Sequence, residues 1–374
     1  MKALVLAGGR GTRLRPITHT SAKQLVPVAN KPVLFYGLEA IRAAGILEVG
    51  IVVGDPREML QPDHRTGERT TVMVNSQAEI RAAVGDGSAF GLEVTYIEQE
   101  APLGLAHAVK ISEDFMGDHP FVMYLGDNLI KDGITPFVRE FEAERPDAQI
   151  LLAHVRNPSE FGVAELEGDH VVRLEEKPAH PRSDLALVGV YLFSRCVFDA
   201  VRAIRPSKRG ELEITDAIQQ LISSGKRVRS HVIEGWWKDT GKVEDMLEGN
   251  RMMLGALESR IEGTVDAATA IEGMVRIGKG ATVERSRLRG PLVIGEGARV
   301  SDAYIGPFTS LGPGVELRGC EIEHSIVLEK SRLLSVPVRI ESSLIGKEAV
   351  ITASEARPRA HRLMIGDSSR VELA

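Results

Sequence analysis

A cluster of glycines and arginines follows the first apolar run of the chain. The stretch LAGGRGTRLRP contains Gly8, Gly9 and Gly11, together with three arginines. Glycines let backbone amides approach a ligand closely, and arginines add positive charge. A glycine-rich loop after a strand is typical of a phosphate site. The alternative is a solvated surface turn.

Two familiar phosphate loops do not fit this stretch. The P-loop requires G-x-x-x-x-G-K-S/T, and no Lys-Ser or Lys-Thr pair follows a glycine at that spacing. The dinucleotide fingerprint requires G-x-G-x-x-G, but Leu14 occupies the position of its third glycine. The absence of a dinucleotide-binding motif from this stretch therefore argues against hydride-transfer chemistry.

Positive charge is concentrated at the start of the chain. Six cations precede the first acid, Glu39: Lys2, Arg10, Arg13, Arg15, Lys23 and Lys31. The whole chain is nevertheless acidic, with 46 Lys and Arg against 52 Asp and Glu. A local positive field favours a small polyanion in one pocket over a nucleic acid, which needs a long basic stripe.

Two polar positions beyond the loop are candidates for chemistry. Lys23 and Gln24 stand just before an apolar segment in SAKQLVPV, although a surface pair would explain them equally well. Asp127 follows the very apolar run VMYLG. A buried acid is costly unless it is paired or holds a cation, so Asp127 is a candidate metal ligand. Its alternative role is to cap a following helix.

Two later motifs combine charge with a turn residue. Glu176 and Lys177 precede a proline in EEKP, which is a weak signal alone. Asp239 stands in GWWKDTG beside both tryptophans of the chain. A packed hairpin explains the tryptophans but does not explain Asp239.

The elements that position these residues follow from hydrophobic patterns. Residues 1 to about 240 alternate apolar runs such as KALVLA, EVGIVVG and PFVMYLGD with helical patterns. One such pattern predicts a helix capped by Asn30 and ended by Gly45. The alternation predicts a doubly wound, mostly parallel α/β sheet. Ligands bind at the carboxyl ends of strands in such sheets, where the glycine loop, Asp55 and Asp127 fall.

From about residue 265, aliphatic residues recur in steps of six, apart from one step of five between Val300 and Ile305, and they often stand before a glycine. The series is Ile277, Val283, Ile294, Val300, Ile305, Leu311, Leu317, Ile345, Ile351 and Ile365. Hexapeptide repetition predicts a left-handed parallel β-helix, in which stacked coils bury an aliphatic core. A helical pattern precedes it. We therefore predict domains at 1–242 and 265–374, joined by a linker helix over 243–264.

Taken together, GGRGTRLRP with Lys23, LGDN, EEKP and WKDTG resemble the sugar nucleotidyltransferase family in order and approximate spacing. The resemblance covers nearly the whole chain and implies a Rossmann-like fold. The variants AKQLVPV and EQEAPLGLAHA are most similar to family members that use dTTP and glucose 1-phosphate. The repeat domain is similar to that of the family's long forms.

The resemblance also implies a role for each site residue. Arg13, Lys23 and Lys177 would be catalytic, and Asp127 and Asp239 would share a Mg²⁺ ion. The nucleotide would be bound by Leu6, Gly8, Gly9, Gly11, Thr12, Gln24, Gln99 and Gly104. The sugar phosphate would be bound by Asn128, Gly162, Glu176, Lys177 and Gly189.

The implied reaction needs neither a covalent intermediate nor a general base, because a phosphate oxygen of the sugar phosphate is already ionised and attacks the nucleotide in line. Three alternatives stay open. One is a relative that uses UTP or GTP, and another is a bifunctional enzyme whose repeat domain transfers acyl groups. The third is a scaffold with a degenerate site.

The amino-acid composition also bears on the cellular compartment and the oligomeric state expected for the protein. Only Cys196 and Cys320 occur, which supports neither a disulfide framework nor a zinc site. No apolar run approaches the length of a membrane span, and KALVLA is too short for a signal. We expect a cytoplasmic homo-oligomer without nucleic-acid or membrane partners. An insertion over 56–76, with His64 in it, is expected to be a surface loop.

Overall fold

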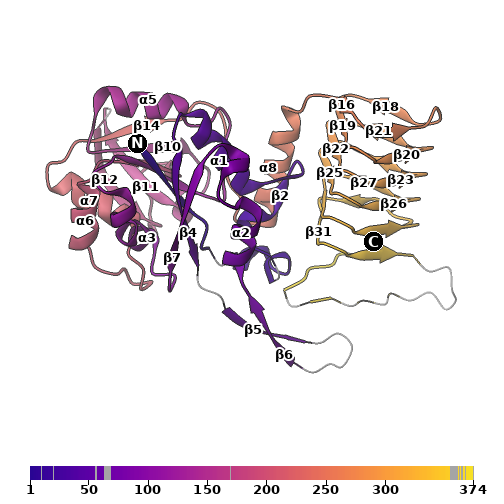
Figure 1. The fold of residues 1–374 in the computed structure, drawn as a ribbon, viewed down its shortest axis with the longest axis horizontal. Helices are drawn as coiled ribbons and strands as arrows, with labels where there is room; N and C mark the ends of the chain where they lie inside the picture. The colour runs from indigo at the N-terminus through magenta and orange to yellow at the C-terminus, as the bar shows by residue number, and fades with distance from the viewer. Residues whose placement is uncertain are drawn as a thin grey trace. The chain divides into compact units, whose positions relative to one another are not determined.

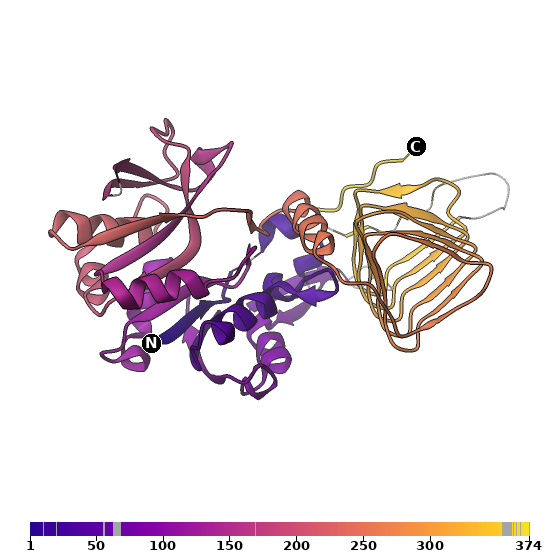
Figure 2. The same ribbon diagram turned by 90° about the horizontal axis from the view of Figure 1, so that it is seen from above.

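The structure is a computed structural model that describes residues 1–9, 11–19, 21–54, 57–62, 69–168, 170–353, 361, 363, 365–366 and 368–373. Asp55 and His64 lie outside these residues. The chain forms two compact units (Figures 1 and 2). The first contains Met1–Arg10, Thr20–Leu25 and Val33–Asp239, and the second contains Gly11–His19, Val26–Pro32 and Thr240–Ala374.

A nine-stranded sheet forms the centre of the first unit (Figure 1). Its strands are β1 (Lys2–Leu6), β4 (Glu48–Gly54), β7 (Glu93–Gln99), β8 (Phe121–Leu125), β10 (Ala148–His154), β11 (Gly162–Glu167), β12 (His170–Glu176), β13 (Leu185–Phe193) and β14 (Val228–Val232). The order is β10-β14-β12-β11-β13-β8-β1-β4-β7. Strands β7, β4, β1 and β8 pair in parallel, and β13 joins β8 antiparallel.

Helices cover both faces of this sheet. Those on one face are α1 (Val33–Ala43), α2 (Ser76–Val84) and α5 (Thr135–Glu144), and those on the other are α3 (Leu105–Ile111), α4 (Glu113–Met116), α6 (Val197–Ala203) and α7 (Ile214–Ser223). Side chains that alternate along β1 contribute to both faces. Ala3 and Val5 pack into the core beneath α1, α2 and α5, whereas Leu4 and Leu6 pack into the core on the opposite face. The doubly wound class is confirmed.

The predicted start of the first helix is wrong. Asn30 does not cap it, because Pro27–Val28 (β2) and Lys31–Pro32 (β3) pair as a small hairpin and α1 begins only at Val33. Ala29 and Asn30 form the hairpin's two-residue turn with φ of 49° and 62°, as such turns require. The predicted end is confirmed, since Gly45 has a φ of 83° and donates its N–H to Arg42 O.

The insertion also differs from the expected loop. Its strands β5 (Arg57–Pro62) and β6 (Arg69–Val74) pair antiparallel, from Arg57 opposite Val74 to Pro62 opposite Arg69. The run TTVMV in the second strand is rich in β-branched residues, which favour strands. The insertion is therefore a hairpin.

The second unit stacks short strands in the pattern of a left-handed parallel β-helix (Figure 2). One sheet contains β16 (Arg260–Ile261), β19 (Val275–Ile277), β22 (Leu292–Ile294), β25 (Thr309–Leu311), β28 (Ile326–Val327) and β31 (Leu344–Ile345). The next contains β17 (Thr264–Val265), β20 (Thr282–Glu284), β23 (Arg299–Ser301), β26 (Glu316–Arg318), β29 (Arg332–Leu334) and β32 (Val350–Thr352). The third contains β18 (Ala270–Glu272), β21 (Arg287–Arg289), β24 (Tyr304–Ile305), β27 (Glu321–Glu323) and β30 (Ile340–Glu341).

The hexapeptide positions form continuous aliphatic columns within this unit. In the first sheet Ile277 pairs with Ile294, and Ile294 in turn pairs with Leu311. Val283 and Val300 pair in the same way in the second sheet. These side chains belong to one buried cluster. The predicted repeat is confirmed as far as Ile351, because each coil places its aliphatic residue on that of the coil before. The inclusion of Ile365 was wrong: the last strand among the described residues is β32, and Ile365 is exposed outside any strand.

A buried asparagine connects α8 (Val243–Gly255) to its neighbours inside the second unit. The Asn250 side chain is fully buried. Its Oδ1 accepts from Ala29 N at 2.8 Å and Ser310 Oγ at 2.7 Å, while its Nδ2 donates to Phe308 O at 2.9 Å. Three polar groups therefore depend on this one side chain, and one of them, Ser310 Oγ, is fully buried.

We expect Asn250→Leu to lower the free energy of unfolding by about 2–4 kcal/mol, since it leaves these three groups without their partner. Urea denaturation of the full chain measures the change. Arg251→Ala is the control, because the half-exposed Arg251 forms an ion pair with Glu248 on the same helix and lies 5.9 Å from the Phe308 ring centroid, and such exposed contacts contribute little. Equal unfolding midpoints for the two variants would contradict the role given to Asn250.

Candidate active site

Three segments of the first unit bring a lysine and two carboxylates together. Lys23 lies in a 3-10 turn (Lys23–Leu25), and Asp127 lies between β8 and β9 (Asn128–Ile130). Strand β15 (Trp237–Asp239) pairs antiparallel with β9, with Asp239 opposite Asn128. Lys23 Nζ forms an ion pair with Asp127 Oδ2 and lies 3.8 Å from Asp239 Oδ1. The structure thus joins three predicted site residues.

The surroundings of this cluster exclude the surface pair considered for Lys23 and Gln24 and the helix cap considered for Asp127. Lys23 and Gln24 are 8% and 2% exposed, so they are not a surface pair. Asp127 does not cap a helix, because strand β9 follows it directly. Burial alone would raise the pKa of Asp127, but the Lys23 ammonium and the hydrogen bonds from Lys23 and Asn128 hold it below its ordinary value. Asp127 is therefore an anion at neutral pH.

Asn128 is held from three sides. Its Nδ2 donates to Asp127 Oδ1 at 2.9 Å, and its Oδ1 accepts from Trp237 Nε1. Tyr124 donates its hydroxyl to Asn128 O at 3.1 Å. Sequence reasoning gave Trp237 only a packing role. The spacing between Trp237 and Asp239 could have indicated a role at the site, because residues two apart in a strand face the same side.

The two carboxylates fit a divalent cation. Both are hard oxygen ligands, and one positive group, the Lys23 ammonium, already lies against both. Among the described residues no group of three or more His, Cys, Asp or Glu side chains could hold a metal. An ion bound by Asp127 and Asp239 would therefore complete its shell with waters and substrate oxygens, as Mg²⁺ usually does.

The glycine loop begins where β1 ends. Leu6 O accepts a hydrogen bond from Gly126 N at 3.0 Å, which ties the loop to the end of β8. A Cβ on Gly8 would lie 3.1 Å from Gly54 N, so strand β4 passes close by and leaves little room for a side chain at this position. A Cβ on Gly9 would lie 3.4 Å from Gln24 Nε2. The loop and Gln24 are thus neighbours at the carboxyl edge of the sheet.

The remaining loop residues belong to the second unit. Gly11 has a φ of 59° and precedes the 3-10 turn Thr12–Leu14. Thr12 and Arg13 are exposed there. Their side chains are accessible to a ligand, and their roles stay predictions.

The predicted base-binding residues come from three segments: Gln99 ends β7, Gly104 precedes α3, and Gln24 lies in the turn Lys23–Leu25. Gln99 stands opposite Gly54, and its Nε2 lies 3.2 Å from Gly104 O. Gln24 is almost fully buried, and within the part of the chain that the structure describes its Oε1 lacks a hydrogen-bond partner. A buried acceptor without a donor is costly, so a ligand N–H or O–H would satisfy it.

The predicted sugar-binding residues form two contact groups. Gly162 pairs with Glu176 across β11 and β12, and a Cβ on Gly162 would lie 3.2 Å from Glu176 Oε2. A Cβ on Gly189 would lie 2.8 Å from the Asn128 side chain, which leaves room only for glycine. Lys177 has a φ of 45° and is 46% exposed, with Nζ 4.0 Å from Glu176 Oε1.

Three neighbours of Glu176 were missed. Arg209 and Thr215 contact its carboxylate, both at 3.3 Å. Burial, followed by the nearby charge of Glu213, raises the pKa of Glu176, while Lys177 and Arg209 oppose that rise. The charged run RGELEITD over 209–216 was the available signal.

A doubly wound sheet whose strand ends carry a glycine loop and a lysine-dicarboxylate cluster is the arrangement of an α/β enzyme that handles phosphates. The chain belongs to the nucleotidyl transferase family, which it matches over residues 2–255. It is 59% identical over 375 residues to a glucose-1-phosphate thymidylyltransferase of Streptomyces antibioticus, covering 100% of this chain and 99% of the relative.

Two further comparisons agree. A glucose-1-phosphate thymidylyltransferase of Streptomyces griseus is 57% identical over 375 residues and is covered completely, as is this chain. A Bacillus anthracis structure described as a glucose-1-phosphate thymidylyltransferase has a TM-score of 0.59 and 33% identity, covering 67% of this chain and 94% of that one.

The protein is thus a nucleotidyltransferase. Enzymes of this type act on a nucleotide and a sugar phosphate and typically use a divalent metal ion. Across the residues with described positions, no helix has both the length and the apolar character needed to cross a membrane.

Proposed function

We propose that the protein transfers a thymidylyl group from dTTP to glucose 1-phosphate, giving dTDP-glucose and pyrophosphate, the first step of dTDP-deoxysugar biosynthesis. The convergence of Lys23, Asp127 and Asp239 at the carboxyl edge of the sheet carries the proposal. The full-length similarity to thymidylyltransferases supports the choice of substrates.

Asp127 and Asp239 would hold a Mg²⁺ ion, whose chemistry is to neutralise phosphate charge and orient the phosphates. Lys23 would move its ammonium from the carboxylates towards the reacting phosphates, and Arg13 would neutralise charge as pyrophosphate departs. Lys177 would bind the sugar phosphate. These cations and the metal ligands supply orientation and electrostatic stabilisation, and the ionised sugar phosphate needs no base.

The other predicted residues complete the two substrate sites. Leu6, Gly8, Gly9, Gly11 and Thr12 would surround the triphosphate, while Gln24, Gln99 and Gly104 would contact the base. Asn128, Gly162, Glu176 and Gly189 would line the sugar site. The buried Gln24 Oε1, which a donor on the ligand would satisfy, supports the base-binding group.

The nucleotide preference tests the proposal. We expect dTTP to be the best substrate in pyrophosphate release with glucose 1-phosphate. UTP lacks one methyl, worth about 0.8 kcal/mol or roughly fourfold in kcat/KM, apart from any effect of its 2′-hydroxyl. CTP should be largely refused, since its exchanged donor and acceptor leave buried groups unpaired at roughly 1–3 kcal/mol each. GTP or ATP as the best substrate would overturn the assignment.

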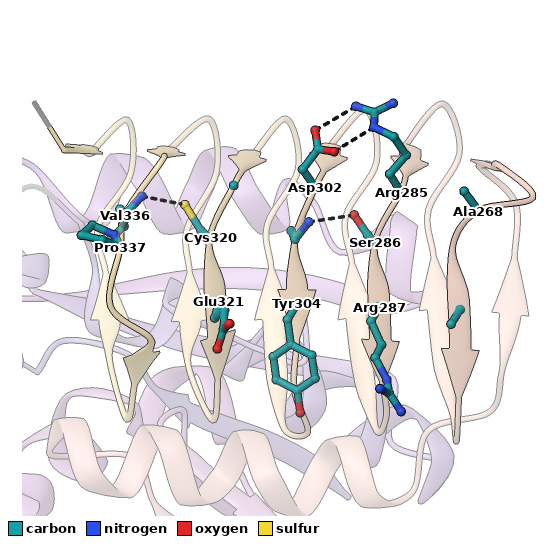
Figure 3. A pocket seen from close by; sticks show the side chains of 13 residues that line it. Ala268, Arg285, Ser286, Arg287, Asp302, Tyr304, Cys320, Glu321, Val336 and Pro337 are labelled. Atoms are coloured by element: carbon teal, nitrogen blue, oxygen red, sulfur yellow. Dashed lines mark hydrogen bonds and ion pairs between the residues drawn. The ribbon is translucent and has the colours of Figure 1, made fainter. Parts of the chain in front are cut away.

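The bifunctional alternative would need an acyl-transfer site on the β-helix. The third sheet carries a hollow of about 670 Å³ there, lined by residues that include Arg285, Asp302, Tyr304 and Cys320 (Figure 3). Arg285 is committed to Asp302 by two contacts of 2.8 Å. None of the described residues lining the hollow is a histidine, the usual base. Consumption of acetyl-CoA would support this alternative.

Assembly and location complete the proposal. Residues 1–242 would form the catalytic domain and 265–374 the repeat domain. The linker over 243–264 is helical only over Val243–Gly255, because the first β-helix strand already starts at Arg260. The open strand edges at the ends of the stacked coils favour pairing with another copy, so we expect a homo-oligomer. Two free cysteines, Cys196 and Cys320, fit a reducing cytoplasm.

A further inference from the structure

The Gln99 side chain makes two hydrogen-bond contacts through one atom. Its Nε2 lies 3.2 Å from Gly104 O and 3.1 Å from His107 Nδ1. His107 lies in α3, so strand β7 and helix α3 meet at this amide. The described residues provide no hydrogen bond to Gln99 Oε1.

These contacts determine which way the amide faces. A backbone carbonyl only accepts hydrogen bonds, so the Gln99 atom beside Gly104 O must be the donor Nε2. The second hydrogen of Nε2 then requires an acceptor, which is His107 Nδ1 in a neutral ring protonated at Nε2. Burial and the Lys110 charge lower the pKa of His107 despite Glu100, which favours this neutral ring.

The backbone fixes the Gly104 carbonyl. Gly104 has a φ of 102°, and a Cβ there would lie 2.4 Å from Leu212 O, so only glycine fits. Leu212 N donates to Leu103 O at 2.7 Å, and Ala106 N donates to Leu212 O at 3.0 Å. The carbonyl that orients Gln99 is therefore locked by bonds on both sides.

The amide also lies near the glycine loop. Gln99 stands opposite Gly54 in the pairing of β7 with β4, and Gly54 is in turn close to Gly8. An oriented amide acceptor at this edge can select a base, because thymine and uracil carry a ring N–H at position 3 whereas cytosine carries a lone pair there.

We propose that His107 is a positioning residue that, with Gly104 O, holds the Gln99 amide so that Oε1 accepts a hydrogen bond from the nucleotide base, and so excludes cytosine. The inference rests on the proposed function for the identity of the site. His107 touches neither substrate nor reacting atoms in this role.

The test compares two substitutions in the full chain. His107→Leu removes the acceptor, whereas His107→Asn keeps one, because an asparagine oxygen can take the place of Nδ1. The Kd values of dTTP and dCTP are measured by calorimetry with Mg²⁺ present. Because both nucleotides carry deoxyribose, the ratio of their Kd values reports selectivity for the base alone. We expect His107→Leu to lower the dTTP preference about tenfold, because the amide can then rotate, and His107→Asn to stay within about twofold of the wild type.

Unchanged selectivity in a folded His107→Leu protein, or an equal loss of affinity for both nucleotides, would overturn the inference. A His107→Asn protein that behaves like His107→Leu would do the same. Should His107→Leu fail to fold, His107→Ala removes the same acceptor with a good helix former. Binding is measured apart from turnover, so failure of wild-type dTTP turnover would refute the proposed function, while the Kd ratio still decides the role of His107.

Discussion

Asp127→Asn and Asp239→Asn are each expected to lower Mg²⁺-dependent turnover by about 10²–10³-fold while the protein stays folded. Each change removes one of the two carboxylates that converge at the end of the sheet and that we propose as metal ligands. An amide has a similar shape but carries no charge, so it binds a hard divalent cation weakly. Pyrophosphate release at several Mg²⁺ concentrations measures the effect, which should shrink as the metal concentration rises.

The matched control is Asp132→Asn, an exposed carboxylate just after β9. It should keep wild-type turnover and the same metal dependence. Circular dichroism and the unfolding midpoint establish that each variant folds. If Asp127→Asn or Asp239→Asn retained near-normal activity at low Mg²⁺, that residue would not be a metal ligand.

The features predictable from sequence are those set by local patterns. The columns through Ile277 and Val283 follow from a six-residue period, because identical coils must stack in register. Asp127 was predictable since an acid after a buried strand needs a counter-charge. The prediction that Asn30 caps the first helix was wrong because Asn30 forms a two-residue hairpin turn with Ala29. Asparagine is favoured both in such turns and at helix caps.

The parts that could not be predicted depend on pairings between distant segments. Trp237 reaches Asn128 only because β15 pairs with β9, 109 residues away in sequence. Arg209 meets Glu176 only after strand β13 and helix α6, which separate the two residues in the chain, have folded. The contact of His107 with Gln99 spans only 8 residues, but the orientation of the amide depends on Gly104. The distant Leu212 fixes the backbone on both sides of Gly104 through its bonds to Leu103 O and Ala106 N.

Lys23→Met is the second change with a large expected effect, and it should move two properties in opposite directions. Lys23 is almost buried and lies against both carboxylates. Methionine keeps the length of the side chain but removes its charge. Turnover should fall by about 10²–10³-fold, because the ammonium that would neutralise the reacting phosphates is lost.

Metal affinity in the absence of nucleotide should instead rise by about tenfold. In the wild type a divalent cation must compete with the Lys23 ammonium for the two carboxylates, and opposite charges some 4 Å apart near a protein surface attract by up to about 4 kcal/mol. Without that competitor, two uncompensated carboxylates remain, which destabilises the folded chain until a cation binds. Added Mg²⁺ should therefore raise the Tm of Lys23→Met more than that of the wild type.

Mn²⁺ titration of the nucleotide-free protein and thermal unfolding with and without Mg²⁺ measure these effects independently of activity. Lys226→Met, at an exposed position, is the control and should match the wild type in both. Weaker metal binding in Lys23→Met would mean that Lys23 organises the two carboxylates for the metal and does not compete with it. Unchanged turnover would remove Lys23 from the reaction, whereas tighter metal binding with lost turnover would identify it as the cation that gives way to the metal and then acts on the phosphates.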